Sequence, residues 1–409
     1  MPRSLDFKIL SAAIIAYFIF FSVFTSLRHY NFQTQTWDMA AFVQTFWNTA
    51  HGKIMYNNLE QAKNHLGVHL SPFLFLLVPG YILFSSPYYL LIIQTIALAL
   101  GALPLYLLAK RRLGPPFPLI IAIGYLLYPQ LHWINTFDFH EIAFFVPLMI
   151  AALYFIDAKK WLWASIFLIL AASVKEDAIL ITAFVGIYLL TLPSAKEKKI
   201  GAAIIILSLI YFLIAVKIIM PALGGGLFRL DRYGSFGSAP AEIIKNIITK
   251  PLLVAETIFN RQKLDYLVWL FVPAAFLPFF SIRSLILLLP GLAENMLTTY
   301  KSQFQSFYHY DSVIVPAIFF GSICGLQNLL TRWPRFKSKA RIILIASFLA
   351  GSNPTPPVLF WRVGGRNSAD RPGPIHWFTK NNKDRDSSFR FIYSDANSFT
   401  PNVVPPPPP

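Results

Sequence analysis

Residues 7–27, FKILSAAIIAYFIFFSVFTSL, contain Lys8 as their one charged side chain. An α-helix needs about 17 to 25 mainly apolar residues to cross the hydrocarbon core of a bilayer, and similar runs recur along most of the chain. The 409 residues are 56% hydrophobic and 13% charged, which is far from the composition of a soluble domain. The sequence therefore predicts an all-α polytopic membrane protein. A β-barrel is disfavoured, because its strands would alternate apolar and polar residues.

The apolar runs divide the chain into a membrane domain, residues 1–352, and a Pro-rich tail, residues 353–409, which we expect to be weakly ordered. Residues 71–84, SPFLFLLVPGYILF, are too short for a span and are interrupted by Pro79 and Gly80, so we predict an interfacial helix there. Eleven transmembrane helices are predicted, at 7–27, 87–109, 117–136, 141–157, 161–174, 178–192, 200–220, 264–280, 283–297, 312–330 and 340–352.

The net charge of +16 comes mainly from Lys and Arg in short loops between the predicted spans. Cytoplasmic loops of membrane proteins are enriched in these residues, so the pattern predicts a cytoplasmic amino terminus in a cell membrane and disfavours nucleic-acid binding. The large loops 28–86 and 221–263, and the loop 298–311, then lie outside. Cys324 is the only cysteine, which excludes an intramolecular disulfide and a thiolate cluster within one chain.

Asp38 follows the first predicted span and lies between Trp37 and Met39. A carboxylate at a membrane interface beside aromatic residues loses part of its hydration, which raises its pKa and suits it to act as a general base. Asp38 also precedes an amphipathic run, so it could instead be a helix N-cap. Both roles are compatible with each other.

Two groups of residues are candidates to line a site near Asp38. His65 and His69 are four residues apart, the spacing of paired metal ligands on a helix, but Gly67 lies between them and no glutamate is adjacent. They could equally form hydrogen bonds to a phosphate or to loop carbonyls. The second group, Asp138, His140 and Glu141, is at the outer end of a predicted span and could be a solvated turn or part of a polar cavity.

Lys175, Glu176 and Asp177 interrupt about thirty mostly apolar residues, so we predict the tip of a helical hairpin at the outer membrane surface. The triplet could be a solvated tip with an internal ion pair, or its lysine could meet a lipid phosphate. Further external residues could act with it: Arg229, Arg232, Arg261 and Lys301 as positive charges, and Tyr308, His309 and Tyr310 as an aromatic belt or a sugar-stacking surface.

Six stretches resemble a prokaryotic family of predicted polytopic membrane proteins, the domain-of-unknown-function family 2079, over roughly residues 30–330. They are WDMAAFVQTFWNTAHG, NHLGVHLSPFLFLLVPGYILF, ALGALPLYLLAKRRLG, FDFHEIAFFVPL, VKEDA and FYHYDSVIVPAIFF. The layout is similar to that of the GT-C superfamily of membrane glycosyltransferases, whose donors are polyprenyl-phosphate-linked sugars. It has one span, then an external loop with an acidic residue, an interfacial helix, and a span that ends in a basic turn.

This resemblance implies an inverting sugar transfer on the external face, with Asp38 at the acidic position that acts as base or orients the acceptor. It also implies that Lys175 lies near the lipid phosphate and that His309 and Tyr310 lie near the donor, and it leaves room for a divalent cation at the phosphate. Two other functions stay open: an accessory subunit of a larger membrane complex and a transporter. A transporter would place charges near the bilayer midplane and break helices in both halves of the chain.

Overall fold

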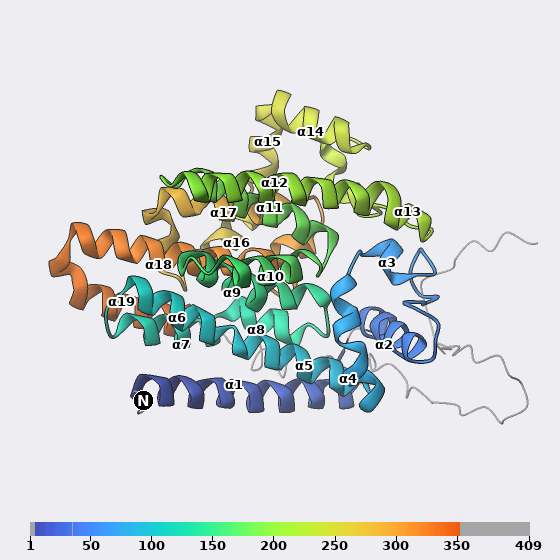
Figure 1. Cartoon of the computed structure of the whole chain (residues 1–409), viewed down its shortest axis with the longest axis horizontal. Helices are drawn as coiled ribbons and strands as arrows, with labels where there is room; N and C mark the ends of the chain where they lie inside the picture. Colours follow the sequence, from blue (N-terminus) through green and yellow to red (C-terminus); the bar gives the residue numbers. More distant parts are fainter. Residues whose placement is uncertain (1–4, 35, 352–409) are drawn as a thin grey trace, which may run out of the picture. The chain divides into compact units, whose positions relative to one another are not determined.

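The structure, a computed structural model, describes residues 5–34 and 36–351, which form helices joined by turns and one isolated β-bridge between Tyr56 and Asn64 (Figure 1). The predicted all-α architecture is therefore confirmed for these residues. The tail predicted at 353–409 lies outside them, as does the last residue of the predicted span 340–352.

The α-helices differ widely in length, from the 26 residues of α1 to the 3 residues of α13. They are α1 (Leu5–Tyr30), α2 (Thr36–Ala50), α3 (His65–Val68), α4 (Val78–Leu83), α5 (Pro87–Leu100), α6 (Ala102–Arg112), α7 (Phe117–Leu126), α8 (Pro129–Thr136), α9 (Phe145–Asp157), α10 (Trp161–Ala172), α11 (Glu176–Leu190), α12 (Ala195–Ile214), α13 (Met220–Ala222), α14 (Pro240–Thr249), α15 (Pro251–Ile258), α16 (Arg261–Phe271), α17 (Ile282–Leu297), α18 (Val315–Arg332) and α19 (Lys337–Gly351).

Tighter or wider helical turns connect many of these helices. The 3-10 helices are η1 (Pro72–Leu76), η2 (Glu141–Phe144), η4 (Leu230–Phe236), η5 (Leu277–Phe280), η6 (Lys301–Phe304), η7 (Tyr310–Val313) and η8 (Pro334–Phe336), and η3 (Ala215–Ile219) is a π-helix. The predicted interfacial helix at 71–84 is two short helices, η1 and α4, which meet at Leu77.

Four helical stretches within the described residues are long and apolar enough to cross a membrane: Leu5–Tyr30, Pro87–Arg112, Phe117–Thr136 and Ala195–Ala222. They match four of the eleven predicted spans. The other seven predicted spans coincide with helices that are shorter or less apolar. The predicted span 264–280, for example, ends its α-helix at Phe271, and Ala275 and Phe276 then adopt positive φ angles, a conformation that a regular helix does not contain.

Helices α1 and α12 lie on the outside of the described bundle (Figure 1). Only 17% of the most apolar window of each is buried. Ile15, Ile19 and Phe20 of α1 are exposed, as are Ile206 and Leu207 of α12. Apolar faces of this size are not stable in water, so they are the surfaces that contact lipid.

Helix α18 forms the centre of the bundle, because every residue from Asp311 to Leu326 is buried. It packs against α6, α9, α17 and η5. Helices α11 and α12 form another close pair, at Gly186 and Gly201. A Cβ atom added at Gly201 would lie 2.6 Å from the carbonyl oxygen of Gly186. Small residues permit such close approach of membrane helices.

The polar side chains gather at two opposite ends of the bundle. At one end Asp157 pairs with both Arg111 and Arg112, at 2.8 and 2.6 Å, and Lys159 lies 3.7 Å from Glu197. These residues come from the ends of α6 and α9 and the start of α12. The opposite end collects the end of α1, the end of α8, the start of α11 and the segment α2–α4, and it contains the residues singled out as a candidate site.

Candidate functional site

Asp38 lies in the first turn of α2, where the partial positive charge of a helix N-terminus favours a carboxylate. It is inside the helix, which begins at Thr36, so the N-cap interpretation is wrong. Its side chain is 38% exposed. Loss of hydration and the negative charge of Glu141 raise the pKa of Asp38, and the positive charge of Arg229 opposes this rise.

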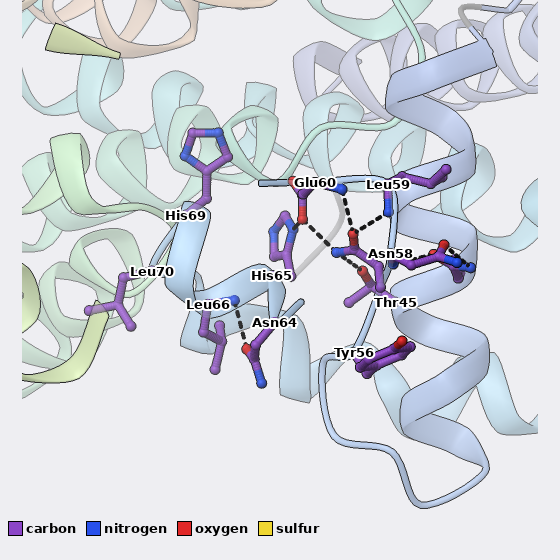
Figure 2. A network of polar contacts seen from close by, with 12 residues as sticks. Thr45, Tyr56, Asn58, Leu59, Glu60, Asn64, His65, Leu66, His69 and Leu70 are labelled. Atoms are coloured by element: carbon purple, nitrogen blue, oxygen red, sulfur yellow. Dashed lines mark hydrogen bonds and ion pairs between the residues drawn. The ribbon is translucent and has the colours of Figure 1, made fainter. Parts of the chain in front are cut away.

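His65 belongs to a network that fixes the loop after α2 (Figure 2). Its Nδ1 lies 2.9 Å from Oε2 of Glu60, and the same carboxylate oxygen accepts a hydrogen bond from Asn57. Burial disfavours the charged imidazolium, but the bond to Glu60 outweighs this effect and raises the pKa of His65. Burial also raises the pKa of Glu60. The interactions with His65 oppose this effect, and the pKa of Glu60 is lowered overall. The network therefore holds an ion pair that shapes the loop.

His69 points away from this network (Figure 2) and joins the loop to the helical bundle instead. Its Nδ1 lies 2.9 Å from Oε1 of Glu176, while Oε2 of Glu176 accepts a 3.0 Å hydrogen bond from the backbone N–H of Leu70. Gly226 N–H donates to the carbonyl of Gly67 nearby. Because His65 and His69 pair with different carboxylates, they are not arranged as two ligands of one metal.

Lys175 lies in the turn between α10 and α11, and only 12% of its side chain is exposed. It is therefore not a solvated hairpin tip. Its Nζ lies 3.4 Å from the Asp177 carboxylate. Burial lowers the pKa of Lys175, but the charges of Asp177, Glu141, Glu176 and Glu294 together raise the pKa above its ordinary value. The positive charge of Lys175 is thus shared among several carboxylates.

Asp138 and His140 lie in a buried turn after α8, and Glu141 is the buried first residue of η2. Asp138 has a φ of 94°, which is rare for a residue with a side chain. Its carbonyl accepts a 2.8 Å hydrogen bond from the Gln94 side chain, whose Oε1 accepts the N–H of His140 at 2.8 Å. Glu141 is 2% exposed, and its Oε2 has no hydrogen-bond partner among the described residues. Gln94 therefore fixes a strained turn that carries a buried carboxylate.

His140 connects three segments of the chain. Its ring stacks on His309 with 3.7 Å between centroids and 19° between planes, and its Nε2 lies 3.8 Å from Oδ2 of Asp38. Burial and the nearby positive charge of Lys175 lower the pKa of His140 to about 3, and burial also lowers that of His309. Both rings are therefore neutral at pH 7. The contact with Asp38 is longer than a hydrogen bond.

Arg232 lies in η4 above two aromatic rings, with its Cζ 4.5 Å from the ring centre of Tyr300 and 5.4 Å from that of Tyr310. Its carbonyl accepts hydrogen bonds from Thr299. In the described part of the chain no carboxylate is within ion-pair distance of Arg232. Lys301 is exposed at the start of η6, and the structure does not bring its side chain to this cluster.

Together these side chains form the acidic-end cluster, in which carboxylates outnumber basic groups. Its members are Asp38, Glu60, Asp138, Glu141, Glu176, Asp177 and Glu294, with Lys175, Arg229 and Arg232, and the histidines 65, 69, 140 and 309. Among the described residues no group of three His, Cys, Asp or Glu side chains could hold a metal ion. The possible divalent cation at the phosphate stays a prediction, because such a cation can be held by one or two carboxylates together with the phosphate itself.

Two members of this cluster were not predicted from the sequence. Glu294 lies in α17 within the apolar run LLLPGLAENML. An ionisable residue inside a predicted span is itself a signal of function, so this residue was detectable. Glu60 lies in the polar loop NNLEQ, where nothing in the residue pattern distinguishes it from a solvated glutamate.

The apolar outer surfaces, the candidate spans and the two polar ends define a helical integral membrane protein. Residues 28–362 match the model of a family described as predicted membrane protein, DUF2079. This match covers more than half of the chain, so the chain belongs to the DUF2079 family. No curated protein and no solved structure matches the chain.

Proposed function

We propose that this protein is a membrane glycosyltransferase that moves a sugar from a polyprenyl-phosphate donor to an acceptor hydroxyl. The observation that carries the proposal is the position of Asp38. It is the most accessible carboxylate of a cluster whose other carboxylates are mostly buried, it has a raised pKa, and Arg229 lies close to it. A general base and a positive charge side by side are what this transfer requires.

The transfer proceeds in one displacement. The acceptor oxygen attacks the anomeric carbon and forms the new glycosidic bond, while the bond from that carbon to the phosphate oxygen breaks. The phosphate leaves with the bonding electrons, and Asp38 takes the proton of the acceptor hydroxyl. Because attack and departure occur on opposite faces, the configuration at the anomeric carbon inverts.

Arg232 and Arg229 are better suited than Lys175 to bind the leaving phosphate. Lys175 already compensates several carboxylates, and drawing it to a phosphate would leave them buried and unpaired. Arg232 has no ion-pair partner in the described part of the chain, and its planar fork matches phosphate geometry. In this proposal Lys175, Glu176 and Asp177 support the site, and Tyr310 and His309 line the donor side.

The proposed membrane arrangement has eleven transmembrane helices in a GT-C-like fold. The end with Arg111, Arg112 and Lys159 faces the cytoplasm, as the enrichment of Lys and Arg in cytoplasmic loops favours, and the acidic-end cluster faces outward. Helices η1 and α4 lie on the outer leaflet. Their exposed apolar residues Leu76, Ile82 and Leu83 support this placement.

The rate of sugar transfer by the Asp38→Asn variant tests the proposal directly. Purified protein in proteoliposomes would receive undecaprenyl-phosphate glucose or mannose and a host lipid extract as acceptor. Loss of a general base typically costs about 10²–10⁴-fold in rate, so Asp38→Asn should lose that much. Asp265→Asn, at a side chain 66% exposed on α16, is the matched control and should retain full activity.

Unchanged transfer in Asp38→Asn would refute the role of Asp38. No transfer by the unaltered protein with any donor, together with a membrane partner that co-purifies in fixed ratio, would favour the accessory-subunit alternative. Vesicle uptake of a solute without transfer would favour a transporter.

Lipid that co-purifies in mild detergent tests the donor site separately. Mass spectrometry should detect a polyprenyl-phosphate sugar with the unaltered protein. A hydrogen bond to a charged group is worth about 1.5–3 kcal/mol. The Arg232→Gln variant should therefore retain at least about tenfold less of the polyprenyl-phosphate sugar. Arg261→Gln, at a side chain 95% exposed, is the control. Equal retention by all three proteins would remove Arg232 from the site.

A further inference from the structure

A cavity of about 290 Å³ lies at the end of the bundle that contains Arg111 and Arg112, opposite the end that contains Asp38. This volume is many times the roughly 10–15 Å³ that is needed to hold one water molecule. The loop between α6 and α7 forms one wall, and the end of α18 with η8 and α19 forms the other. The cavity is lined by Arg112, Phe117, Gln327, Leu330, Thr331 and Lys337.

The cavity has an apolar floor and a polar rim. Phe117 is buried, whereas Thr331 and Lys337 are exposed. Arg112 and Gln327 are joined across it, because Nη1 of Arg112 donates a 3.1 Å hydrogen bond to Oε1 of Gln327. Such a lining suits a ligand with a polar head and an apolar continuation.

The charge around the cavity is positive. Asp157 is the carboxylate that binds Arg112, and Arg111 shares it, so one negative charge faces two positive charges. Lys337 lines the cavity and makes no ion pair within the described residues. Arg335 and Lys339 follow the same wall. A ligand with at least one negative charge is therefore favoured there.

The cavity also lies at the level of the membrane surface. Arg112 ends the candidate span Pro87–Arg112, and Phe117 begins the next one. Trp333, 53% exposed, neighbours the rim, with Arg332 near its ring. Trp residues are enriched at the boundary between lipid and water, and basic pockets between membrane helices bind lipid head groups.

We propose that this cavity binds the phosphate of an anionic phospholipid, with Lys337 on the phosphate, Arg112 beside it, and the partly exposed Leu330 against the glycerol and acyl chains. The site is separate from the acidic-end cluster, and it does not rest on the proposed glycosyl transfer. A free phosphate offers the same charged group without the apolar part.

Native mass spectrometry of delipidated full-length protein tests the proposal, with phosphatidylglycerol, phosphatidylcholine or inorganic phosphate added. Phosphatidylglycerol should bind at least several times more tightly than phosphatidylcholine. Lys337→Gln should lower the affinity for phosphatidylglycerol by about fivefold, which is the loss expected for one basic residue at an anionic surface. Gly114 lines the cavity, and a Cβ atom added there meets nothing within 4 Å. Gly114→Trp should therefore fill the cavity with the new side chain and abolish lipid binding.

Lys199→Gln is the control, since Lys199 is an exposed lysine at the same end, on α12. It should change the affinity less than twofold. Equal effects of Lys337→Gln and Lys199→Gln would overturn the proposal, because they would indicate diffuse attraction. Binding of phosphatidylcholine as tight as that of phosphatidylglycerol would overturn it too. If inorganic phosphate binds as tightly as the lipid, the ligand of this cavity is a free anion and the lipid proposal is wrong.

Discussion

Replacement of Glu176 by glutamine tests whether one buried carboxylate ties the loop after α2 to the helical bundle. Glu176 accepts from the Leu70 N–H at 3.0 Å and contacts His69 Nδ1 at 2.9 Å. The side chains of Glu176 and His69 are 11% and 18% exposed, so solvent screens the pair little. Glutamine keeps the shape and an acceptor for Leu70, but it removes the charge.

Two estimates of the loss agree. A hydrogen bond to a charged group contributes about 1.5–3 kcal/mol, against about 0.5–1.5 kcal/mol for a neutral bond, so two bonds lose roughly 2–3 kcal/mol. Burial raises the pKa of Glu176, but His69 and Lys175 lower it further, to about 2 from the ordinary 4.5. At 1.36 kcal/mol per unit this shift corresponds to roughly 3 kcal/mol. We therefore expect Glu176→Gln to cost about 2–4 kcal/mol at pH 7.

The assay is reversible unfolding in dodecyl maltoside micelles with increasing sodium dodecyl sulfate, followed by tryptophan fluorescence. Glu256→Gln, at an exposed glutamate of α15, should stay within about 0.5 kcal/mol. A double-mutant cycle with His69→Gln should give a coupling of about 1–3 kcal/mol. Because the pKa of Glu176 is lowered, its contribution is complete above pH 4.5 and is lost toward pH 2. A coupling energy below about 0.5 kcal/mol would show that the contact between Glu176 and His69 does not join the loop to the bundle.

Two further predictions concern the charge of the cluster and the packing of the helices. Glu141→Gln should move the acid limb of the transfer rate against pH to lower pH, because removal of the Glu141 charge lowers the raised pKa of Asp38; an unmoved limb would show that Asp38 does not sense Glu141. Gly201→Leu should destabilise the protein by about 1–3 kcal/mol in the same unfolding assay, because the new side chain meets Gly186, whereas Gly114→Ala should change stability little; equal stability of the two variants would contradict the close packing of α11 and α12.

The helices were predictable because each apolar run reflects one local requirement, burial in lipid or in the bundle. The chain between 264 and 280 shows the limit of this reasoning. Its composition is that of a span, yet α16 ends at Phe271 and η5 begins at Leu277. Composition does not specify the left-handed turn at Ala275 and Phe276, which precedes η5, an element that packs against α18.

Which end of the bundle holds the candidate residues was also predictable, since alternate loops of a helical bundle emerge on one side. Asp38 and His140 are in contact as a result. The partners within that end were not predictable. The pairing of His69 with Glu176 joins residues 107 positions apart, and a single sequence contains no signal for it. The burial of Lys175 follows from the same tertiary contacts.

The excess of carboxylates at this end bears on how the cluster could act. Glu141 is 2% exposed and one of its oxygens has no partner in the described part of the chain, so its charge is costly. A positive charge nearby or a proton would offset that cost. The neutral rings of His140 and His309 supply neither, whereas the positive charge of Lys175 interacts with Glu141. Lys175 offsets part of the negative charge at this end of the bundle, and burial together with the charge of Glu141 keeps the Asp38 carboxylate basic. A reaction that removes a proton at Asp38 benefits from this arrangement, whereas a site built only to bind an anion would not.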